Sequence, residues 1–266
     1  MTDFKAIVRN AAMGLGLSAL YFRFVEWRMK RGREAPPAAD ADGVPIPPLE
    51  LMARVVAYAD WRQFLATGEA TARSLDRYAA EAGINFADAA RILDLGCGAG
   101  RVIRHLPKLT DAALFGVDYN PSLAGWCAKN LKGDFRRNEL RPPLDFPEAH
   151  FDIIYLISVF THLRIPTQRE WLAEVARVTR PGGVVLVTFH DENQPGLPDT
   201  DEARTALKLD GVFIHNDRIE GSNFIATFQT EAFTRALMQE QFDVVRIVPR
   251  KESTIGQTLA ILRKRS

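Results

Sequence analysis

The sequence predicts an α/β fold built on a mainly parallel sheet, with a helical extension before it. Short apolar runs, such as 92–95 and 151–156, are typical of strands covered on both faces, as in parallel sheets. Segments with apolar residues at helical spacing, such as 167–178, lie between these runs. The 266 residues are 47% hydrophobic and can bury one sizeable core, so a second independent domain is not required.

The first 33 residues are expected to form an apolar and basic arm. Residues 4–29 are apolar and compatible with a helix, but the uncharged run 10–22 is shorter than the roughly 20 residues of a membrane-spanning helix. Basic residues follow it closely. We therefore expect residues 4–33 either to make a peripheral membrane contact, to bind a partner, or to pack on their own domain.

A linker and a helical region follow the arm. Residues 34–48 are rich in Pro, Ala and Asp, a composition typical of a linker. Helical spacing returns over 49–83. An ordinary turn glycine and a solvated arginine are the favoured interpretations of Gly68 and Arg73, and a position near the ligand site is the alternative. We interpret residues 49–266 as one domain in which helices precede the first strand.

The segment ILDLGCGAGR, residues 92–101, combines a buried strand, a glycine turn and the start of a helix. Its glycines allow a sharp turn that leaves backbone amides open to a ligand. A dinucleotide fingerprint would have a third glycine where Arg101 stands, which disfavours a nicotinamide oxidoreductase. Asp94 would repel a pyrophosphate and attract an ammonium group. The turn therefore predicts a cradle for a cofactor with a positively charged head.

The next strand, within residues 112–118, ends on Asp118. A carboxylate at this position can accept hydrogen bonds from both hydroxyls of a ribose, and its charge disfavours a 2′-phosphate. The predicted ligand therefore carries an unmodified ribose.

Together these motifs resemble those of the class I methyltransferases that use S-adenosyl-L-methionine. The resemblance continues through 138–163, which includes SVFTHL, and 171–190, which includes RPGG. It implies a Rossmann-like, seven-stranded, mainly parallel sheet with an antiparallel last strand, and a polar contact from Asn138 or Glu139 to adenine. The residues expected to bind the cofactor are Asp94, Gly96, Cys97, Gly98, Asp118, Tyr119, Asn138, Glu139 and Ser158.

The remaining elements follow the same pattern. We expect the fourth strand at 151–156, a helix at 167–178, and a turn at 180–183 that leads into the fifth strand. A helix over 230–241 and strands over 242–248 and 258–262 complete the expected fold.

Candidate bases lie where the fourth and fifth strands end. His162 and His190 both follow these strands, beside the crevice where open parallel sheets bind ligands. A neutral imidazole suits proton removal near neutral pH, although each histidine can instead have a structural role. Asp191 is one candidate for orienting His190. The polar stretch 191–227 is interpreted as a substrate lid or as an exposed insertion.

Composition limits the partners. The net charge of +1 does not indicate a nucleic-acid-binding surface, and Cys97 and Cys127 form neither a metal-ligand spacing nor a disulfide framework. We expect a cytoplasmic enzyme, without a metal, that methylates oxygen or nitrogen of a small-molecule or glycan acceptor. The alternative is a noncatalytic S-adenosylmethionine-binding scaffold recruited to a membrane or partner by the arm. The oligomeric state is not predicted.

Overall fold

The computed structural model describes residues 33–56, 60–217, 220–222 and 225–266, and it divides into two compact units, 1–66 and 67–266. The expectations for the arm fall almost entirely on residues 1–32, which lie outside the described residues. Residues 34–48 form no helix or strand apart from one bridge between Ala39 and Pro45. Helix α3 (Leu49–Val55) follows, and α4 (Trp61–Glu81) contains the boundary between the units.

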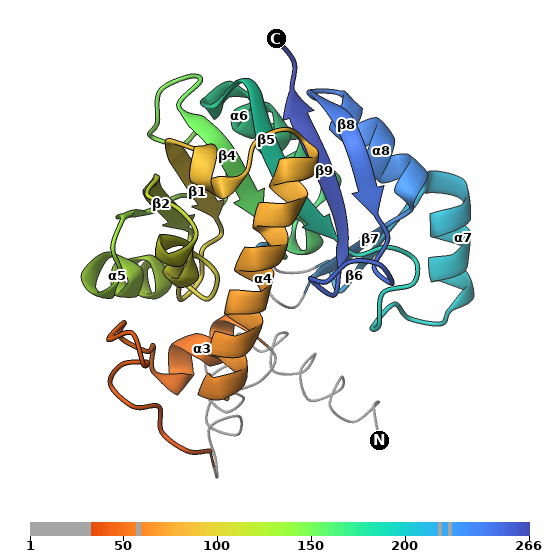
Figure 1. Cartoon of the computed structure of the whole chain (residues 1–266). Coiled ribbons are helices and arrows are strands. Elements are labelled where there is room, and N and C mark those ends of the chain that lie inside the picture. Colours follow the sequence, from red (N-terminus) through yellow and green to blue (C-terminus); the bar gives the residue numbers. More distant parts are fainter. Residues whose placement is uncertain (1–32, 57–59, 218–219, 223–224) are drawn as a thin grey trace. The chain divides into compact units, whose positions relative to one another are not determined.

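The second unit is built on a seven-stranded sheet with the order β3-β2-β1-β4-β5-β9-β8 (Figure 1). Strands β1 to β5 are parallel to one another, and β9 is antiparallel to both β5 and β8. The predicted parallel sheet with an antiparallel last strand is confirmed. The strands are β1 (Arg91–Leu95), β2 (Ala113–Asp118), β3 (Asp134–Arg137), β4 (Phe151–Leu156), β5 (Thr179–Phe189), β8 (Phe242–Val248) and β9 (Thr258–Lys264).

The strand order has its switch point between β1 and β4, which is where open parallel sheets bind ligands. The chain adds β2 and β3 on one side of β1, and β4 and β5 on the other. Where the order reverses in this way, the connections leave a crevice outside the carboxyl ends of the strands. The predicted site residues lie at or just after the carboxyl ends of the five strands β1 to β5, so this edge is where a site is expected.

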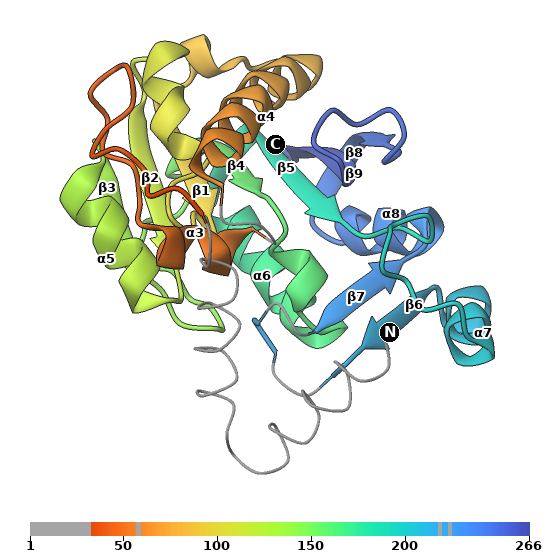
Figure 2. The same cartoon turned by 90° about the horizontal axis from the view of Figure 1, so that it is seen from below.

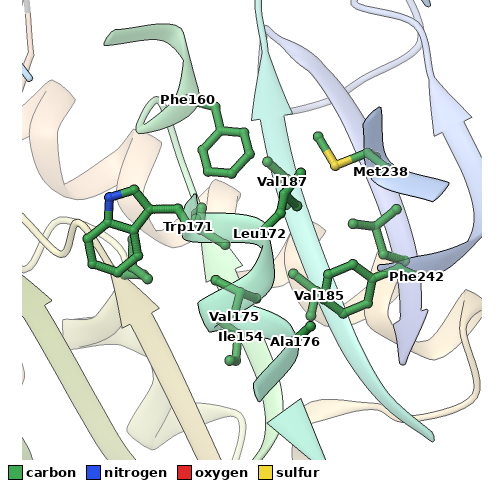
Figure 3. Close-up of a cluster of buried hydrophobic side chains, with 14 of the residues drawn as sticks. Ile154, Phe160, Trp171, Leu172, Val175, Ala176, Val185, Val187, Met238 and Phe242 are labelled. Atoms are coloured by element: carbon green, nitrogen blue, oxygen red, sulfur yellow. The ribbon is translucent and has the colours of Figure 1, made fainter. Parts of the chain in front are cut away.

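Buried side chains cover both faces of the sheet. Leu93 and Leu95 belong to a core that includes residues of α6 (Ile165–Val178) and α8 (Glu231–Gln239), shown in Figure 3. Ile92, on the opposite face, packs in a second core with Ala72 and Leu75 of α4. This alternation explains why the strands have continuous apolar sequences.

Two helices differ from the sequence-based expectation. The segment after the glycine turn is a 3-10 helix, η2 (Ile103–Lys108), and not an α-helix. Pro107 inside it lacks an amide hydrogen and would clash with the carbonyl four residues earlier in an α-helix. Helix α6 begins at Ile165, two residues earlier than predicted, because Pro166 is compatible with the first helical turn.

Fold elements also occupy the polar stretch 191–227. It contains α7 (Asp201–Asp210) and β6 (Val212–His215), which pairs with β7 (Ala226–Gln229) in a separate antiparallel sheet (Figure 2). Ala203, Phe213 and Phe228 form a small core there. The remaining elements are α5 (Pro121–Asn130) and the 3-10 helices η1 (Phe86–Asp88) and η3 (Phe160–His162). Within the part of the chain that the structure describes, no helix is both long and apolar enough to cross a membrane.

Candidate functional site

The glycine turn is fastened to the end of β2. The amides of Gly96 and Cys97 donate to the Val117 carbonyl at 2.8 and 2.9 Å, and the Gly98 amide donates to Asp118 Oδ2 at 2.8 Å. Three amides that the sequence indicated as open to a ligand are therefore already hydrogen-bonded. Gly96 has a φ of +82°, and a Cβ there would lie 2.4 Å from Val159 Cγ2, so this position requires glycine.

Asp118 links two turns and keeps capacity for further hydrogen bonds. Its Oδ1 accepts from the Asn120 amide at 2.8 Å, while its Oδ2 accepts from Gly98. Burial raises the pKa of this carboxyl, and both amides oppose that effect. Each carboxylate oxygen accepts more than one hydrogen bond, so ligand hydroxyls can still bind here. Tyr119 follows it and is 43% exposed.

Asp94 is the most strongly perturbed carboxyl of the site. Burial raises its pKa to about 7, against the opposing effects of the Tyr155 hydroxyl and the Arg101 guanidinium. The buried Tyr155 hydroxyl has no hydrogen-bond partner of standard geometry among the described residues. Because the carboxyl lacks a close cationic partner strong enough to offset burial, an ammonium group at this position would stabilise its charged form.

Asn138 offers a buried acceptor. Its amide nitrogen Nδ2 donates to the Glu139 carbonyl at 2.7 Å, which identifies the other terminal atom as oxygen. That Oδ1 is buried and has no partner among the described residues. The exposed Glu139 carboxylate instead pairs with Arg137 at 3.3 Å. Of the two residues, Asn138 is therefore the one equipped to accept a hydrogen bond from a ligand N–H.

Ser158 and His190 are joined through a residue that the sequence did not single out. Ser158 Oγ donates to Gln257 Oε1 at 2.9 Å, and Gln257 Nε2 donates to His190 Nε2 at 3.1 Å. Ser158 has a φ of +59°, an uncommon conformation for a residue with a side chain. Burial, followed by the effect of His162, lowers the pKa of His190 to about 4.

The interpretation of Asp191 as the residue that orients His190 is wrong. The Asp191 carboxylate accepts from Thr258 Oγ1 at 2.5 Å and from the Asn193 amide at 2.8 Å. It therefore fixes the turn after β5 to the start of β9. Gln257, and not Asp191, contacts the imidazole of His190.

His162 lies against the insertion formed by residues 191–227. Its Nδ1 donates to the Ile225 carbonyl at 2.8 Å, and its own carbonyl accepts from the Gly221 amide at 2.9 Å. Burial lowers the pKa of His162. A Cβ on Gly221 would lie 2.5 Å from Leu140 Cδ1, so the insertion also approaches the segment between β3 and β4.

Comparison with known proteins relates this chain to methyltransferases. A model of the methyltransferase domain matches residues 92–183, from the first strand to the turn in β5. The sterol 24-C-methyltransferase of Saccharomyces cerevisiae is 31% identical over an alignment of 179 residues that covers 53% of this chain and 44% of that protein. The enzyme of the same name from Eremothecium gossypii is 32% identical over an alignment of 151 residues that covers 48% of this chain and 38% of that protein.

Residues 92–183 match the methyltransferase domain of the class I S-adenosylmethionine-dependent enzymes. Solved structures share its fold: a SAM-dependent methyltransferase from Methanosarcina mazei has a TM-score of 0.52 at 21% identity, covering 68% of this chain and 94% of that one. A SAM-bound amino pentose methyltransferase from Micromonospora echinaspora has a TM-score of 0.51 at 16% identity, covering 76% and 91%. This chain spans less than half the length of the two sterol methyltransferases that it matches.

The methyltransferase domain also depends on a glycine that was interpreted as an ordinary turn residue. Gly68 lies inside α4, where a Cβ would be 2.0 Å from the Arg101 carbonyl oxygen at the end of the glycine turn. An isolated glycine within a helical pattern was the available signal. Arg73 pairs with Glu69 at 2.8 Å on the surface, as a solvated arginine would. Within the described residues, no three His, Cys, Asp or Glu side chains are grouped to hold a metal.

Proposed function

We propose that the chain transfers the methyl group of S-adenosylmethionine to a small-molecule acceptor. The observation that carries this proposal is the set of three matched groups beside the crevice: Asp94, Asp118 and Asn138. Asp94 would take the ammonium group, Asp118 the ribose hydroxyls, and Asn138 Oδ1 the amino group of adenine. Each has the charge or acceptor capacity that its assigned group needs.

The remaining cofactor residues would shape the cradle. Gly96 and Gly98 give the turn its positive φ values, and Cys97 would contribute only backbone, since its thiol is buried. Tyr119 would cover the ribose side, with Ser158 at the end of β4. When bound, the cofactor supplies a methyl carbon made electrophilic by its sulfonium, and the chain then has to align the acceptor and receive a proton.

His162 is the better candidate for receiving that proton. A carbonyl oxygen only accepts hydrogen bonds, so Nδ1 of His162 carries hydrogen and Nε2 is the basic nitrogen. His190 has its Nε2 engaged by Gln257, and its low pKa keeps it neutral and weakly basic. We propose that His190 holds Gln257 and Ser158 in place.

The similar proteins and the insertion at 191–227 bear on the choice of acceptor. The similar sterol 24-C-methyltransferases methylate carbon by name, which moves the first acceptor to test from oxygen or nitrogen to an unsaturated carbon. A glycan acceptor rests on family resemblance alone. We further propose that the insertion at 191–227 acts as the substrate lid, supported by its contacts with His162 and Leu140. From the sequence, we also propose a cytoplasmic location, with peripheral membrane contact through residues 4–33.

Calorimetric titration tests the cofactor assignment. We expect S-adenosylhomocysteine to bind more tightly than NAD, and Asp118→Ala to weaken its affinity about tenfold or more through lost hydrogen bonds to a charged group. Asp111→Ala, in the turn before β2, is the matched control. Because Asp118 also holds the Gly98 amide, thermal unfolding of each variant should accompany the titration. Tighter binding of NAD, or unchanged affinity of Asp118→Ala, would contradict the assignment.

Transfer of a labelled methyl group then separates an enzyme from a scaffold. The screen begins with sterol and isoprenoid alkenes, and continues with sugars and glycolipids. Transfer that is lost in Asp94→Ala would support catalysis. Binding of S-adenosylhomocysteine without transfer to any acceptor class would favour the noncatalytic scaffold.

A further inference from the structure

The segment beside His162 is held by a buried carboxylate from the insertion. We propose that Glu220 is a positioning residue that anchors the insertion to α6 and so fixes His162 with hydrogen on Nδ1 and the free electron pair on Nε2. The catalytic importance of this arrangement rests on the proposed function, in which His162 receives a proton. The tautomer itself does not, and is measurable without any substrate.

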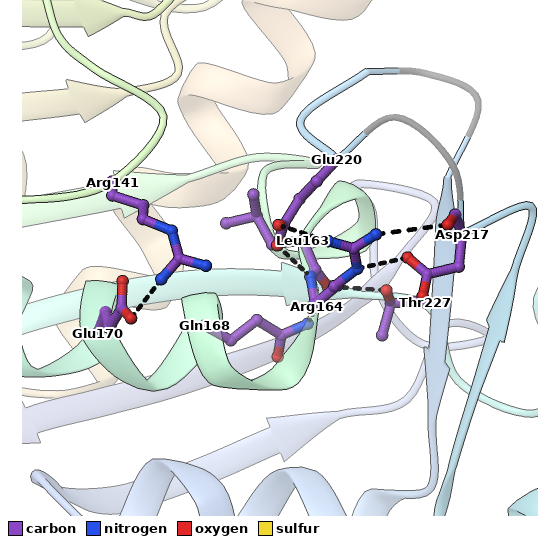
Figure 4. A network of polar contacts seen from close by, with 8 residues as sticks. All are labelled: Arg141, Leu163, Arg164, Gln168, Glu170, Asp217, Glu220 and Thr227. Atoms are coloured by element: carbon purple, nitrogen blue, oxygen red, sulfur yellow. Dashed lines mark hydrogen bonds and ion pairs between the residues drawn. The ribbon is translucent and has the colours of Figure 1, made fainter.

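Arg164, at the start of α6, connects the segment that follows His162 with the insertion, as Figure 4 shows. Its backbone amide donates to Glu220 Oε1 at 2.8 Å, and its Nη1 lies 3.4 Å from Glu220 Oε2. Its Nε donates to Asp217 Oδ1 at 2.5 Å. The Glu220 side chain is only 7% exposed, whereas that of Asp217 is 45% exposed. Hydrogen bonds to a shielded carboxylate are stronger than exposed ion pairs, so Glu220 is the main anchor.

Hydrogen bonds on either side continue the attachment toward His162. Gly221 follows Glu220 directly, and its amide donates to the His162 carbonyl at 2.9 Å. Thr227 Oγ1 donates to the Leu163 carbonyl at 2.8 Å. Between these two bonds lies the contact of His162 Nδ1 with the Ile225 carbonyl. The anchored segment therefore delivers the carbonyl that selects the tautomer.

Removal of the anchor has a chemical consequence. With the Ile225 carbonyl in place, only the tautomer with hydrogen on Nδ1 is compatible with the hydrogen bond. If Glu220 no longer holds Arg164, the main anchor is lost and only the bonds of Gly221 and Thr227 remain, so we expect the Ile225 carbonyl to shift and the imidazole to adopt either tautomer. In the second tautomer Nε2 carries hydrogen and cannot receive a proton from the acceptor.

Nitrogen-15 NMR of the full chain at about pH 7.5 reads the tautomer directly, at a pH where a histidine of ordinary or lowered pKa is neutral. His162→Gln identifies the resonances of His162 among the five histidines. We expect one tautomer in the wild type and in Asp217→Ala, and a mixture in Glu220→Ala. Glu220→Gln keeps an acceptor oxygen for the Arg164 amide and should lie between them.

Kinetics add a second measurement once an acceptor is found. Glu220→Ala should lower kcat about tenfold with a smaller change in KM, because the base is misaligned while the cofactor site is intact. S-adenosylhomocysteine affinity and the unfolding temperature establish that the variant is folded. A single unchanged His162 tautomer in folded Glu220→Ala, or equal mixing in Asp217→Ala, would overturn the proposal. Neither result depends on whether the chain methylates anything.

Discussion

Asp94 shows how one residue can combine a structural cost with a binding role. Its carboxyl is 3% exposed at the end of β1, and burial raises its pKa to about 7. A buried carboxyl that is easily protonated adds little to folding at neutral pH. The same group gains most from a bound cation, because an ammonium group stabilises the charged form and restores its ordinary pKa. The charged form of Asp94 is therefore stabilised more by a bound cationic ligand than by the side chains around it in the folded chain.

The proposed contact makes cofactor affinity depend on pH. Because the carboxyl must lose a proton to bind the ammonium group, affinity should rise as pH increases toward about 7 and change by up to about tenfold per unit below it. Calorimetry with S-adenosylhomocysteine between about pH 5.5 and 7.5 measures this slope. Asp94→Asn should bind more weakly at the upper end and lose the slope.

Asp111→Asn provides the matched control, since Asp111 is exposed and lies before β2, outside the proposed contacts. The control should keep the wild-type slope. A wild-type affinity that is flat over this range, or a slope that survives in Asp94→Asn, would remove Asp94 from the ammonium site.

The sequence predicted residue types better than residue partners. Asp94 and Asp118 were identified from the ends of strands, a position that local sequence sets, whereas Asn138 was identified from the family resemblance. The partner of Asp191 could not be predicted from its neighbours, because Thr258 lies 67 residues away. Ser158 and Gln257 are 99 residues apart. Such pairs form only when β9 inserts beside β5, which no local pattern encodes.

At the scale of elements, strands were predicted more accurately than helices and insertions. Strand β4 has the predicted bounds because its apolar run is buried on both faces. The helix predicted after the glycine turn is present as a short 3-10 helix, because Pro107 is incompatible with the interior of an α-helix. The helix and strands within 191–227 were missed because their polar faces concealed a small core around Phe213 and Phe228.

The crossing of α4 over the glycine turn gives a test at this scale. Gly68→Ala places a methyl group 2.0 Å from the Arg101 carbonyl oxygen, and backbone must move to accept it. Overpacking of this kind costs about 1–3 kcal/mol in the free energy of unfolding. We also expect weaker binding of S-adenosylhomocysteine, because the displaced backbone adjoins the cradle. Urea unfolding and calorimetry measure the two effects.

Gly125→Ala in α5 is the matched control. A Cβ at Gly125 meets nothing within 4 Å, so the variant should gain roughly 0.5–1 kcal/mol from helix propensity. Cofactor affinity should not change. If Gly68→Ala is as stable as Gly125→Ala, the close approach of α4 to the turn does not constrain the methyltransferase domain.

For the whole molecule, the site contains groups whose titrations oppose each other. Burial lowers the pKa of His190 to about 4 and raises that of Asp94 to about 7. The unfolded chain binds a proton at His190 where the folded chain does not, so the stability linked to neutral His190 is lost as pH falls from about 6.5 to 4. At Asp94 the folded chain binds the extra proton, so stability is lost as pH rises from about 4 to 7. Between about pH 4 and 6.5, the contributions of His190 and Asp94 to the free energy of unfolding change in opposite directions and largely cancel.

When one of the two groups is replaced, the free energy of unfolding should show the pH dependence that the other group contributes. Without the His190 contribution, His190→Asn should lose stability as pH rises from about 5 to 6.5, by up to about 1.4 kcal/mol per unit relative to the wild type. Asp94→Asn should show the opposite trend, because Asp94 then no longer opposes the contribution of His190. Urea unfolding at several pH values measures both slopes, and the double variant should return to a nearly flat curve. Parallel curves for the wild type and both single variants would show that neither group is perturbed as its burial requires, and would weaken the assignments of His190 and Asp94 together.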